Sequence, residues 1–247
     1  MRLTLALVAT LTATTALAGG LGDMTEAERA AFREEVRAYL MENPEVIVEA
    51  MTELQIREDE AAMNRDLQLM EENKDAIYNS AADWVGGNPD GDITVVEFMD
   101  YRCGYCRKAY EEVEELVKAD GNIRFVLKEF PILGEESLLS SQFAISVRML
   151  YGDEAYKKAH DALVTLRGEA NSETLARLAT ELGHDPAAVT AKMASEEVKA
   201  VILANHDLAT TLEINGTPTF VIDRTMVRGY VPLDGMQQIV AGQRKDG

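Results

Sequence analysis

The stretch ITVVEFMDYRCGYC, residues 93–106, holds both cysteines of this 247-residue chain and decides its fold. Its first half, residues 93–99, is rich in β-branched residues and predicts a strand buried on both faces. The segment CGYCRKAYEEVEELVKA, residues 103–119, repeats apolar residues at helical spacing. A second apolar run, residues 123–130, predicts another buried strand. The pattern therefore predicts a strand, helix, strand unit with the cysteines at the first turn.

Helices are expected on the N-terminal side of this unit, from residue 24 to about residue 80. Thr25 and Glu28 have the spacing of a capping box, and Asn43-Pro44 restarts a helix. Apolar residues form a stripe along this segment, and the segment itself offers no core to cover it. We therefore expect the arm to pack on its own domain or against the same arm of another subunit.

The rest of the chain predicts a block of helices inside an α/β fold. WVGGNPDGD, residues 84–92, is interpreted as a turn-rich boundary. Residues 135–211 show only helical patterns. Strand signals return at residues 217–223 and 225–229, and a last helix is expected over about residues 232–241.

Charge and the N-terminal sequence restrict the function. The net charge of −19 repels phosphate backbones, so nucleic acid is not an expected partner. MRLTLALVATLTATTALAGG, residues 1–20, has the pattern of a secretory signal with cleavage after Ala18. Its apolar run is too short to cross a bilayer, and no other segment of the sequence is apolar enough. We therefore expect an exported mature chain without a membrane span, in a compartment that permits disulfides.

The position of CGYC at a helix start points to thiol chemistry. The first amides of a helix lack partners and carry partial positive charge, which stabilises a thiolate and lowers the thiol pKa from about 8.5. Cys103 is the predicted exposed nucleophile, and Cys106, one turn further, is the predicted resolving thiol. Gly104 lets a partner backbone approach the sulfur, and Tyr105 offers an apolar ring beside it.

Two cysteines at this spacing can also have uses other than redox catalysis. A structural disulfide between Cys103 and Cys106 closes a loop of two residues and stabilises little. Zinc requires four ligands, and the three histidines, expected at the surface or in caps, do not pair at ligand spacing: His160, His184 and His206. Two thiolates can hold copper(I), so a copper carrier stays open, as does an interaction module with an inert disulfide.

Two further positions fit redox catalysis. Glu97 is an acid in a strand otherwise suited to burial. It is either a strand-end residue that reaches solvent or a buried carboxyl that relays a proton to or from Cys106. Pro218 in NGTPTF has no amide to donate, which leaves the backbone groups of Thr217 free. A substrate peptide can then add itself there as an extra strand.

The order ITVVEF, CGYC, KEFPILG, helical block, NGTPTF resembles the thioredoxin-like disulfide oxidoreductases of the DsbA superfamily over about residues 83–242. Residues 32–51 are similar to the N-terminal extension of the ScsC (suppressor of copper sensitivity) branch, in which some members are oligomers. The resemblance implies an α/β thioredoxin fold with a helical insertion, in the periplasm. It also implies roles for Cys103, Cys106 and Glu97, and a cis Thr217-Pro218 bond beside the cysteines.

The expected organisation is a signal peptide over residues 1–18, a helical oligomerisation extension over 19–82, and a thioredoxin-like domain over 83–247 with its insertion at about 135–211. The expected function is disulfide isomerisation or reduction in exported client proteins, by a homo-oligomer joined through residues 24–80 and reset by a membrane redox partner. A DsbA-like disulfide donor and a copper(I)-binding protein, with a link to copper resistance, are the alternatives.

One departure from the family pattern sets an expectation for the redox potential. Strongly oxidising DsbA members carry Pro-His between the cysteines, whereas this chain carries Gly104-Tyr105. A histidine beside the thiolate stabilises the reduced form, so its absence predicts a less oxidising couple.

Overall fold

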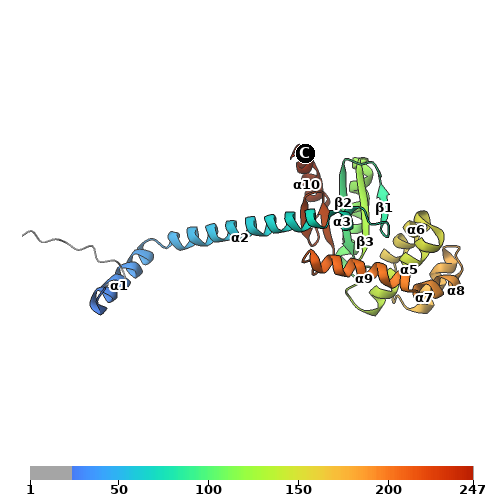
Figure 1. Cartoon of the computed structure of the whole chain (residues 1–247), viewed down its shortest axis with the longest axis horizontal. Coiled ribbons are helices and arrows are strands. Elements are labelled where there is room, and N and C mark those ends of the chain that lie inside the picture. Colours follow the sequence, from blue (N-terminus) through green and yellow to red (C-terminus); the bar gives the residue numbers. More distant parts are fainter. Residues whose placement is uncertain (1–23, 247) are drawn as a thin grey trace, which may run out of the picture. The chain divides into compact units, whose positions relative to one another are not determined.

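The computed structural model describes residues 24–246, so the predicted signal peptide lies outside the described residues. The chain divides into two compact units between Glu60 and Ala61. Figure 1 shows the helices and strands of both. Among residues 24–246, no helix has both the length and the apolar character that a membrane crossing requires.

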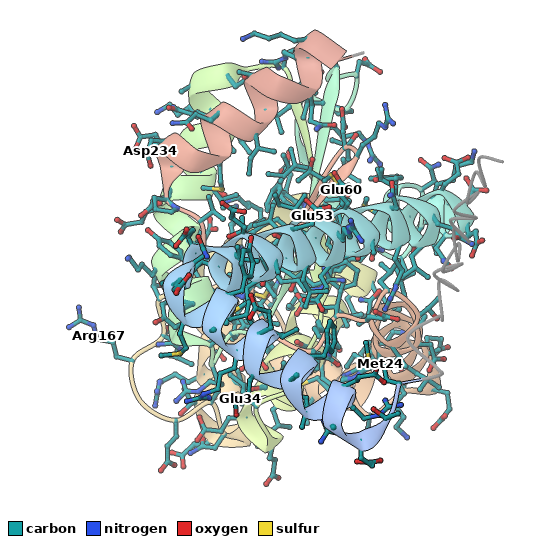
Figure 2. All side chains as sticks on the ribbon, turned by 90° about the vertical axis from the view of Figure 1, so that its left-hand side faces the viewer. Met24, Glu34, Glu53, Glu60, Arg167 and Asp234 are labelled. Carbon is teal, nitrogen blue, oxygen red and sulfur yellow. The ribbon has the colours of Figure 1, made fainter. Side chains whose placement is uncertain are left out.

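The first unit consists of α1 (Glu26–Glu42) and the first part of α2 (Glu45–Glu72). The predicted capping box is confirmed: Glu28 N–H donates to Thr25 Oγ1 at 3.3 Å, and Thr25 N–H donates to Glu28 Oε2 at 2.8 Å. No residue of α1 is buried. Figure 2 shows its side chains, and those of the first part of α2, projecting outwards on all sides.

The second unit begins with the end of α2 and with α3 (Lys74–Tyr78). Met70 and Ile77 are buried there against the sheet residues Val96 and Val126. The compact unit therefore starts at Ala61, earlier than the boundary at residue 83 predicted from the sequence. The difference arises because the weak apolar pattern after Ala61 covers one face of the sheet.

Five strands form one sheet in the order β1-β3-β2-β4-β5. They are β1 (Trp84–Gly87), β2 (Ile93–Met99), β3 (Ile123–Glu129), β4 (Thr219–Ile222) and β5 (Thr225–Arg228). β2 and β3 are parallel and are connected through α4 (Gly104–Asp120), as predicted, and the other pairs are antiparallel.

Strand β1 corrects the sequence prediction, which placed a turn there. Trp84 pairs with Leu127 and Gly87 pairs with Arg124, so β1 forms one edge of the sheet. The Trp84 ring folds over Gly86, where a Cβ atom would lie 2.1 Å from a ring carbon. Glycine is therefore required inside a strand at this position, and its presence made the segment resemble a turn.

The predicted helical insertion is present over the expected residues. It comprises α5 (Glu135–Tyr151), α6 (Asp153–Val164), α7 (Ser172–Glu181), α8 (Pro186–Met193) and α9 (Glu196–Thr211). Figure 1 shows α6, α7 and α8 gathered at the end of the second unit near β1. The last helix, α10 (Leu233–Asp246), continues beyond the predicted end at residue 241.

The alternation of side chains along β2 places the chemistry of the site. Val95 and Met99 point to the face covered by α4, α6 and α10, whereas Val96 and Phe98 point to the face covered by α3 and the ends of α2 and α9. Since successive residues of a strand face opposite sides, Glu97 shares the α4 side with Val95 and Met99. The strand register therefore sets Glu97 within the core beneath the helix that carries the cysteines.

Candidate active site

The two cysteines lie where β2 leads into α4. Cys103 is the N-cap residue of α4 with extended backbone angles, and Cys106 is on the first turn. Both are free thiols in the structure. A disulfide between them in the oxidised form stays a prediction.

The environment of Cys103 lowers its pKa to about 5. The largest cause is a hydrogen bond from the Cys106 thiol, and the backbone amides of Cys106 and Tyr105 add to it, against the opposing effect of burial. These amides belong to the first turn of α4, so the helix start lowers the pKa of Cys103 as predicted. The hydrogen bond from the Cys106 thiol lowers this pKa more than the amides do. Cys103 is therefore a thiolate at neutral pH.

Cys106 has the opposite environment. It is buried, and this burial raises the pKa of its thiol far above the ordinary value, followed by its hydrogen bond to Cys103 and the nearby carboxyl of Glu97. The two thiols therefore differ in protonation: Cys103 can attack directly, whereas Cys106 must first lose a proton.

Cys103 is less exposed than the sequence led us to expect. The residue is 7% exposed, whereas the neighbouring Tyr105 is 62% exposed and Gly104 has open space where a side chain would extend. The loop at Thr217 accounts for this burial, because the thiol form of Cys103 donates a hydrogen bond to the Thr217 carbonyl at 3.1 Å.

The Thr217-Pro218 loop lies directly against Cys103. Its peptide bond is cis, and Pro218 accepts a hydrogen bond from Gly229 N–H at 2.9 Å. In the thiol form of Cys103 the Thr217 carbonyl accepts the hydrogen bond from Cys103, so the carbonyl is free for a substrate only when Cys103 is a thiolate. A groove of about 230 Å³ follows the loop; it is lined by Asn215, Gly216, Thr217, Pro218, Thr219, Arg228 and Gly229.

Glu97 is buried within β2 and does not reach solvent. Its side chain is in the core at 5% exposure, and burial raises its pKa to about 8, followed by the negative charges of Cys103 and Glu114. Of the two interpretations left open by the sequence, the buried carboxyl near Cys106 is the one that the structure contains.

Sequence reasoning missed Asp100, which holds the active-site turn in place. This fully buried carboxylate accepts from Arg102 N–H at 2.7 Å on one oxygen. Its other oxygen accepts from Ile132 N–H at 2.7 Å and from Leu133 N–H at 3.0 Å. Asp100 thus connects the turn before Cys103 to the loop that follows β3.

A buried polar network next to the site was also missed. Glu129 accepts hydrogen bonds from the hydroxyls of Tyr101, Tyr156 and Ser141, and Tyr101 also contacts His160. The prediction of surface or capping positions is wrong for His160, which is 4% exposed. A signal was available, because the adjacent charges Lys128 and Glu129 in a strand buried on both faces must both enter the core, on opposite sides.

The other two histidines have local roles. His184 lies in the predicted turn before α8 and stacks on Tyr151, and His206 contacts the carbonyl of Pro131 at 3.1 Å. Within residues 24–246, no three His, Cys, Asp or Glu side chains cluster as metal ligands do.

The sheet, the helix that starts at the first of two cysteines and the facing cis-proline loop define a thioredoxin-like protein. Residues 79–241, more than half of the chain, match the family model described as Thioredoxin, and the chain belongs to this family. Residues 28–61 match a second model, described as the N-terminal domain of the copper resistance protein ScsC.

Solved structures agree with this assignment. A thioredoxin-like oxidoreductase from Silicibacter pomeroyi DSS-3 is 42% identical, with a TM-score of 0.65, over 70% of this chain and 98% of that one. Proteus mirabilis ScsC in a transitional conformation is 25% identical, with a TM-score of 0.66, over 92% of this chain and 100% of that one.

Among curated proteins, the Na(+)/H(+) antiporter NhaA 1 of Salinispora arenicola is 28% identical over 159 residues, which are 64% of this chain. The match covers 24% of the antiporter, so the chain spans about a quarter of the length of the curated relatives it matches.

Proposed function

We propose that this protein is a periplasmic thiol–disulfide oxidoreductase that reduces and reshuffles disulfides in exported proteins. One observation carries the proposal: a stabilised thiolate at Cys103 faces the cis-proline loop, with a buried protonated thiol, Cys106, behind it. The relatives described as oxidoreductase and as ScsC support the same class of reaction.

The reaction follows from the two protonation states. The Cys103 thiolate attacks one sulfur of a client disulfide, forms a mixed disulfide and releases the second client sulfur as a thiolate. Cys106 then gives up its proton and attacks the Cys103 sulfur, so that a Cys103–Cys106 disulfide forms and the first client sulfur leaves as a thiolate. The client gains two electrons and the protein loses two. In isomerisation a client thiolate displaces Cys103 instead, and the protein stays reduced.

The groove along Thr217-Pro218 supports a peptide substrate. Thr217, whose carbonyl contacts Cys103, is among the residues that line the groove, so an extended client segment in it would lie close to the Cys103 sulfur. We propose exported proteins with cysteines as clients, and a membrane redox partner that returns the Cys103–Cys106 disulfide to thiols.

Trapping of clients tests this function. In Cys106→Ala the mixed disulfide cannot be resolved from within, so we expect covalent adducts between Cys103 and cysteine-containing client proteins, seen as mass shifts on non-reducing gels and removed by reductant. The double variant Cys103→Ala/Cys106→Ala is the matched control without adducts. A copper(I) carrier would form no adducts in Cys106→Ala, and such a result would exclude the proposed reaction.

The choice between isomerase and disulfide donor depends on the number of subunits, and the first unit bears on that number. Nine large apolar side chains of α1 and α2 are exposed in it: Phe32, Val36, Tyr39, Met41, Ile47, Val48, Met51, Leu54 and Ile56. So much exposed apolar surface on helices favours association with other copies. We therefore propose a homo-oligomer joined through this arm, in which several active sites can hold one misfolded client.

Solution mass tests the oligomer. We expect light scattering to give a multiple of the chain mass for the wild-type protein and a smaller mass for Met51→Glu/Leu54→Glu, because charges then replace apolar contacts. Gln55→Glu, which adds a charge to the same helix at a polar position, is the control and should keep the wild-type mass. A wild-type protein with the mass of one chain would contradict the oligomer and favour the disulfide donor.

A further inference from the structure

A small cavity lies beneath Cys106 in the core of the second unit. About 10 Å³ of it is open to the centre of a water molecule, which is the lower limit for holding one water. Its polar lining comes from three elements: Glu97 of β2, Cys106, Tyr110 and Glu114 of α4, and His160 of α6. The insertion helix α6 therefore brings an imidazole to the same cavity as the resolving thiol and the buried carboxyl.

A hydrogen-bonded chain fixes the orientation of the His160 ring. Nδ1 of His160 lies 3.1 Å from the Tyr101 hydroxyl, and Tyr101 donates to Glu129 at 2.8 Å. Glu129 also accepts from Tyr156 at 2.6 Å and from Ser141 at 2.7 Å. The three hydroxyl donors favour the carboxylate form of Glu129, but burial outweighs them and raises its pKa to about 7.

This chain also fixes where the imidazole carries its hydrogen. Tyr101 has one hydroxyl hydrogen, and that hydrogen goes to Glu129 when Glu129 is ionised. Its oxygen can therefore only accept from His160, so Nδ1 of His160 carries the hydrogen and Nε2 of the neutral ring is left as an acceptor. Burial lowers the pKa of His160 to about 4, which keeps the ring neutral at pH 7.

We propose that His160 is a positioning residue for the resolving step: its Nε2 accepts a hydrogen bond from a water molecule in the cavity, and this water carries the proton from Cys106 to Glu97. The inference rests on the proposed function. A water held in this way has three polar partners, since it donates to Nε2 and to Glu97 and accepts from the Cys106 thiol. With one hydrogen held by Nε2, the other is directed to the carboxylate.

The proton balance of the step is complete. The S–H bond of Cys106 breaks and its proton moves to the oxygen of the water. The water then transfers to Glu97 the hydrogen that it had donated to this carboxylate, and it keeps the hydrogen that is bonded to Nε2. The Cys106 thiolate attacks the Cys103 sulfur, and the bond from that sulfur to the client breaks. The Cys103 charge that helps to raise the pKa of Glu97 is absent from the mixed disulfide, so this pKa is lower at this stage and a larger share of Glu97 is ionised and able to accept.

Other ionisable groups near His160 enter its pH dependence. Those that line the cavity or act on the ring are Glu97, Tyr101, Cys106, Tyr110, Glu114, Glu129, Tyr156, Lys157 and Asp161. Of these, Asp161 raises the pKa of His160 and Lys157 lowers it, both less than burial. The ring therefore stays uncharged over the range in which Glu97 exchanges its proton.

The test separates the two chemical steps on the full-length reduced protein with oxidised glutathione as the probe. Acid quenching and mass spectrometry give the rate of mixed-disulfide formation at Cys103 and the rate of glutathione release by Cys106. In His160→Leu we expect formation to be unchanged and release to slow at least tenfold. Without the water bridge the proton leaves to hydroxide, so release should keep rising about tenfold per pH unit from pH 6 to 10, whereas wild-type release should level off above the pKa of Glu97, which is about 8 with the Cys103 thiolate present.

Two further variants keep the test decisive. His160→Gln retains an acceptor at the cavity and should restore release to within about threefold of wild type. Tyr101→Phe keeps the volume of the side chain but removes the oxygen that orders the ring, so release should slow and its pH profile should steepen. This variant decides the case if His160→Leu does not fold.

His206→Leu is the matched control, since this histidine lies at the Pro131 carbonyl and does not line the cavity. It should keep the wild-type release rate and pH profile. Wild-type release rates and pH profiles in folded His160→Leu and in Tyr101→Phe would overturn the inference while leaving the proposed function intact. A wild-type protein that forms no mixed disulfide with glutathione would overturn the proposed function itself.

Discussion

Disulfide exchange by the reduced protein is expected to follow a titration with a midpoint near pH 5 and to be lost entirely in Cys103→Ala. The midpoint is set by the Cys103 pKa of about 5, which hydrogen bonds from the Cys106 thiol and the first amides of α4 hold below its ordinary range. Because the thiolate is the nucleophile, the rate of alkylation by iodoacetamide should rise from pH 4 to 6 and then stay level to pH 8.

A variant of the second cysteine tests what causes the low pKa of Cys103. Cys106→Ala removes the largest hydrogen bond to the Cys103 thiolate, so the alkylation midpoint should move upwards in this variant. An alkylation midpoint near pH 8.5 in the wild-type protein, the value of an ordinary cysteine, would contradict the mechanism.

The same thiolate links the stability of the reduced form to pH. The folded pKa of Cys103 is lower than its unfolded value, so the contribution to the free energy of unfolding is fully present above the unfolded pKa and is lost as pH falls through 5.

A pKa of about 5 lies between those of thioredoxin, about 7, and DsbA, about 3.5. A reduction potential between about −270 and −120 mV is therefore expected, less oxidising than DsbA.

Lys128→Met is expected to lower the free energy of unfolding by about 3–5 kcal/mol, because it leaves a buried carboxylate without its counter-charge. Lys128 and Asp83 are both buried and form an ion pair, and Lys128 Nζ also donates to the Ala76 carbonyl at 2.7 Å. Burial raises the pKa of Asp83 and lowers that of Lys128, so each charge depends on the other.

Chemical denaturation of three variants measures this effect. The double variant Asp83→Leu/Lys128→Met removes both charges and should recover most of the stability lost in Lys128→Met. Lys199→Met breaks the exposed pair with Glu196 and should cost at most about 1 kcal/mol, which makes it the matched control. A loss below about 1 kcal/mol in Lys128→Met would show that the buried pair does not stabilise the second unit.

The sequence predicted the elements that have strong local patterns. The β-branched run at residues 93–99 predicted β2, the apolar run at residues 123–130 predicted β3, and the helical spacing after Gly134 predicted the insertion. The edge strand β1 was missed because two of its four residues are glycines, which resemble a turn until the pairing with β3 is known. The end of α2 was assigned to the arm because its stripe is weak, and only the sheet shows that Met70 belongs to the core.

The residues of the candidate active site also differ in whether the sequence alone could predict them. Cys103, Cys106 and Pro218 were identified because their chemistry is local and their spacing is distinctive. His160 was not, because it reaches Cys106 only through the packing of α6 on α4, 54 positions away along the chain. The burial of Cys103 was also missed, since it depends on the carbonyl of Thr217 from the far end of the sequence.

Lys128 and Glu129 stand next to each other on β3 and enter opposite sides of the sheet. Lys128 meets Asp83, and Glu129 meets the hydroxyls of Tyr101 and Tyr156. If β3 slipped by one position during folding, both charges would change sides: in one direction Glu129 would take the place of Lys128 and face Asp83, and in the other Lys128 would take the place of Glu129 among the hydroxyls of Tyr101 and Tyr156. The two charges thus favour the native register of β3. A misaligned strand would be destabilised electrostatically, which would not happen with a purely apolar strand.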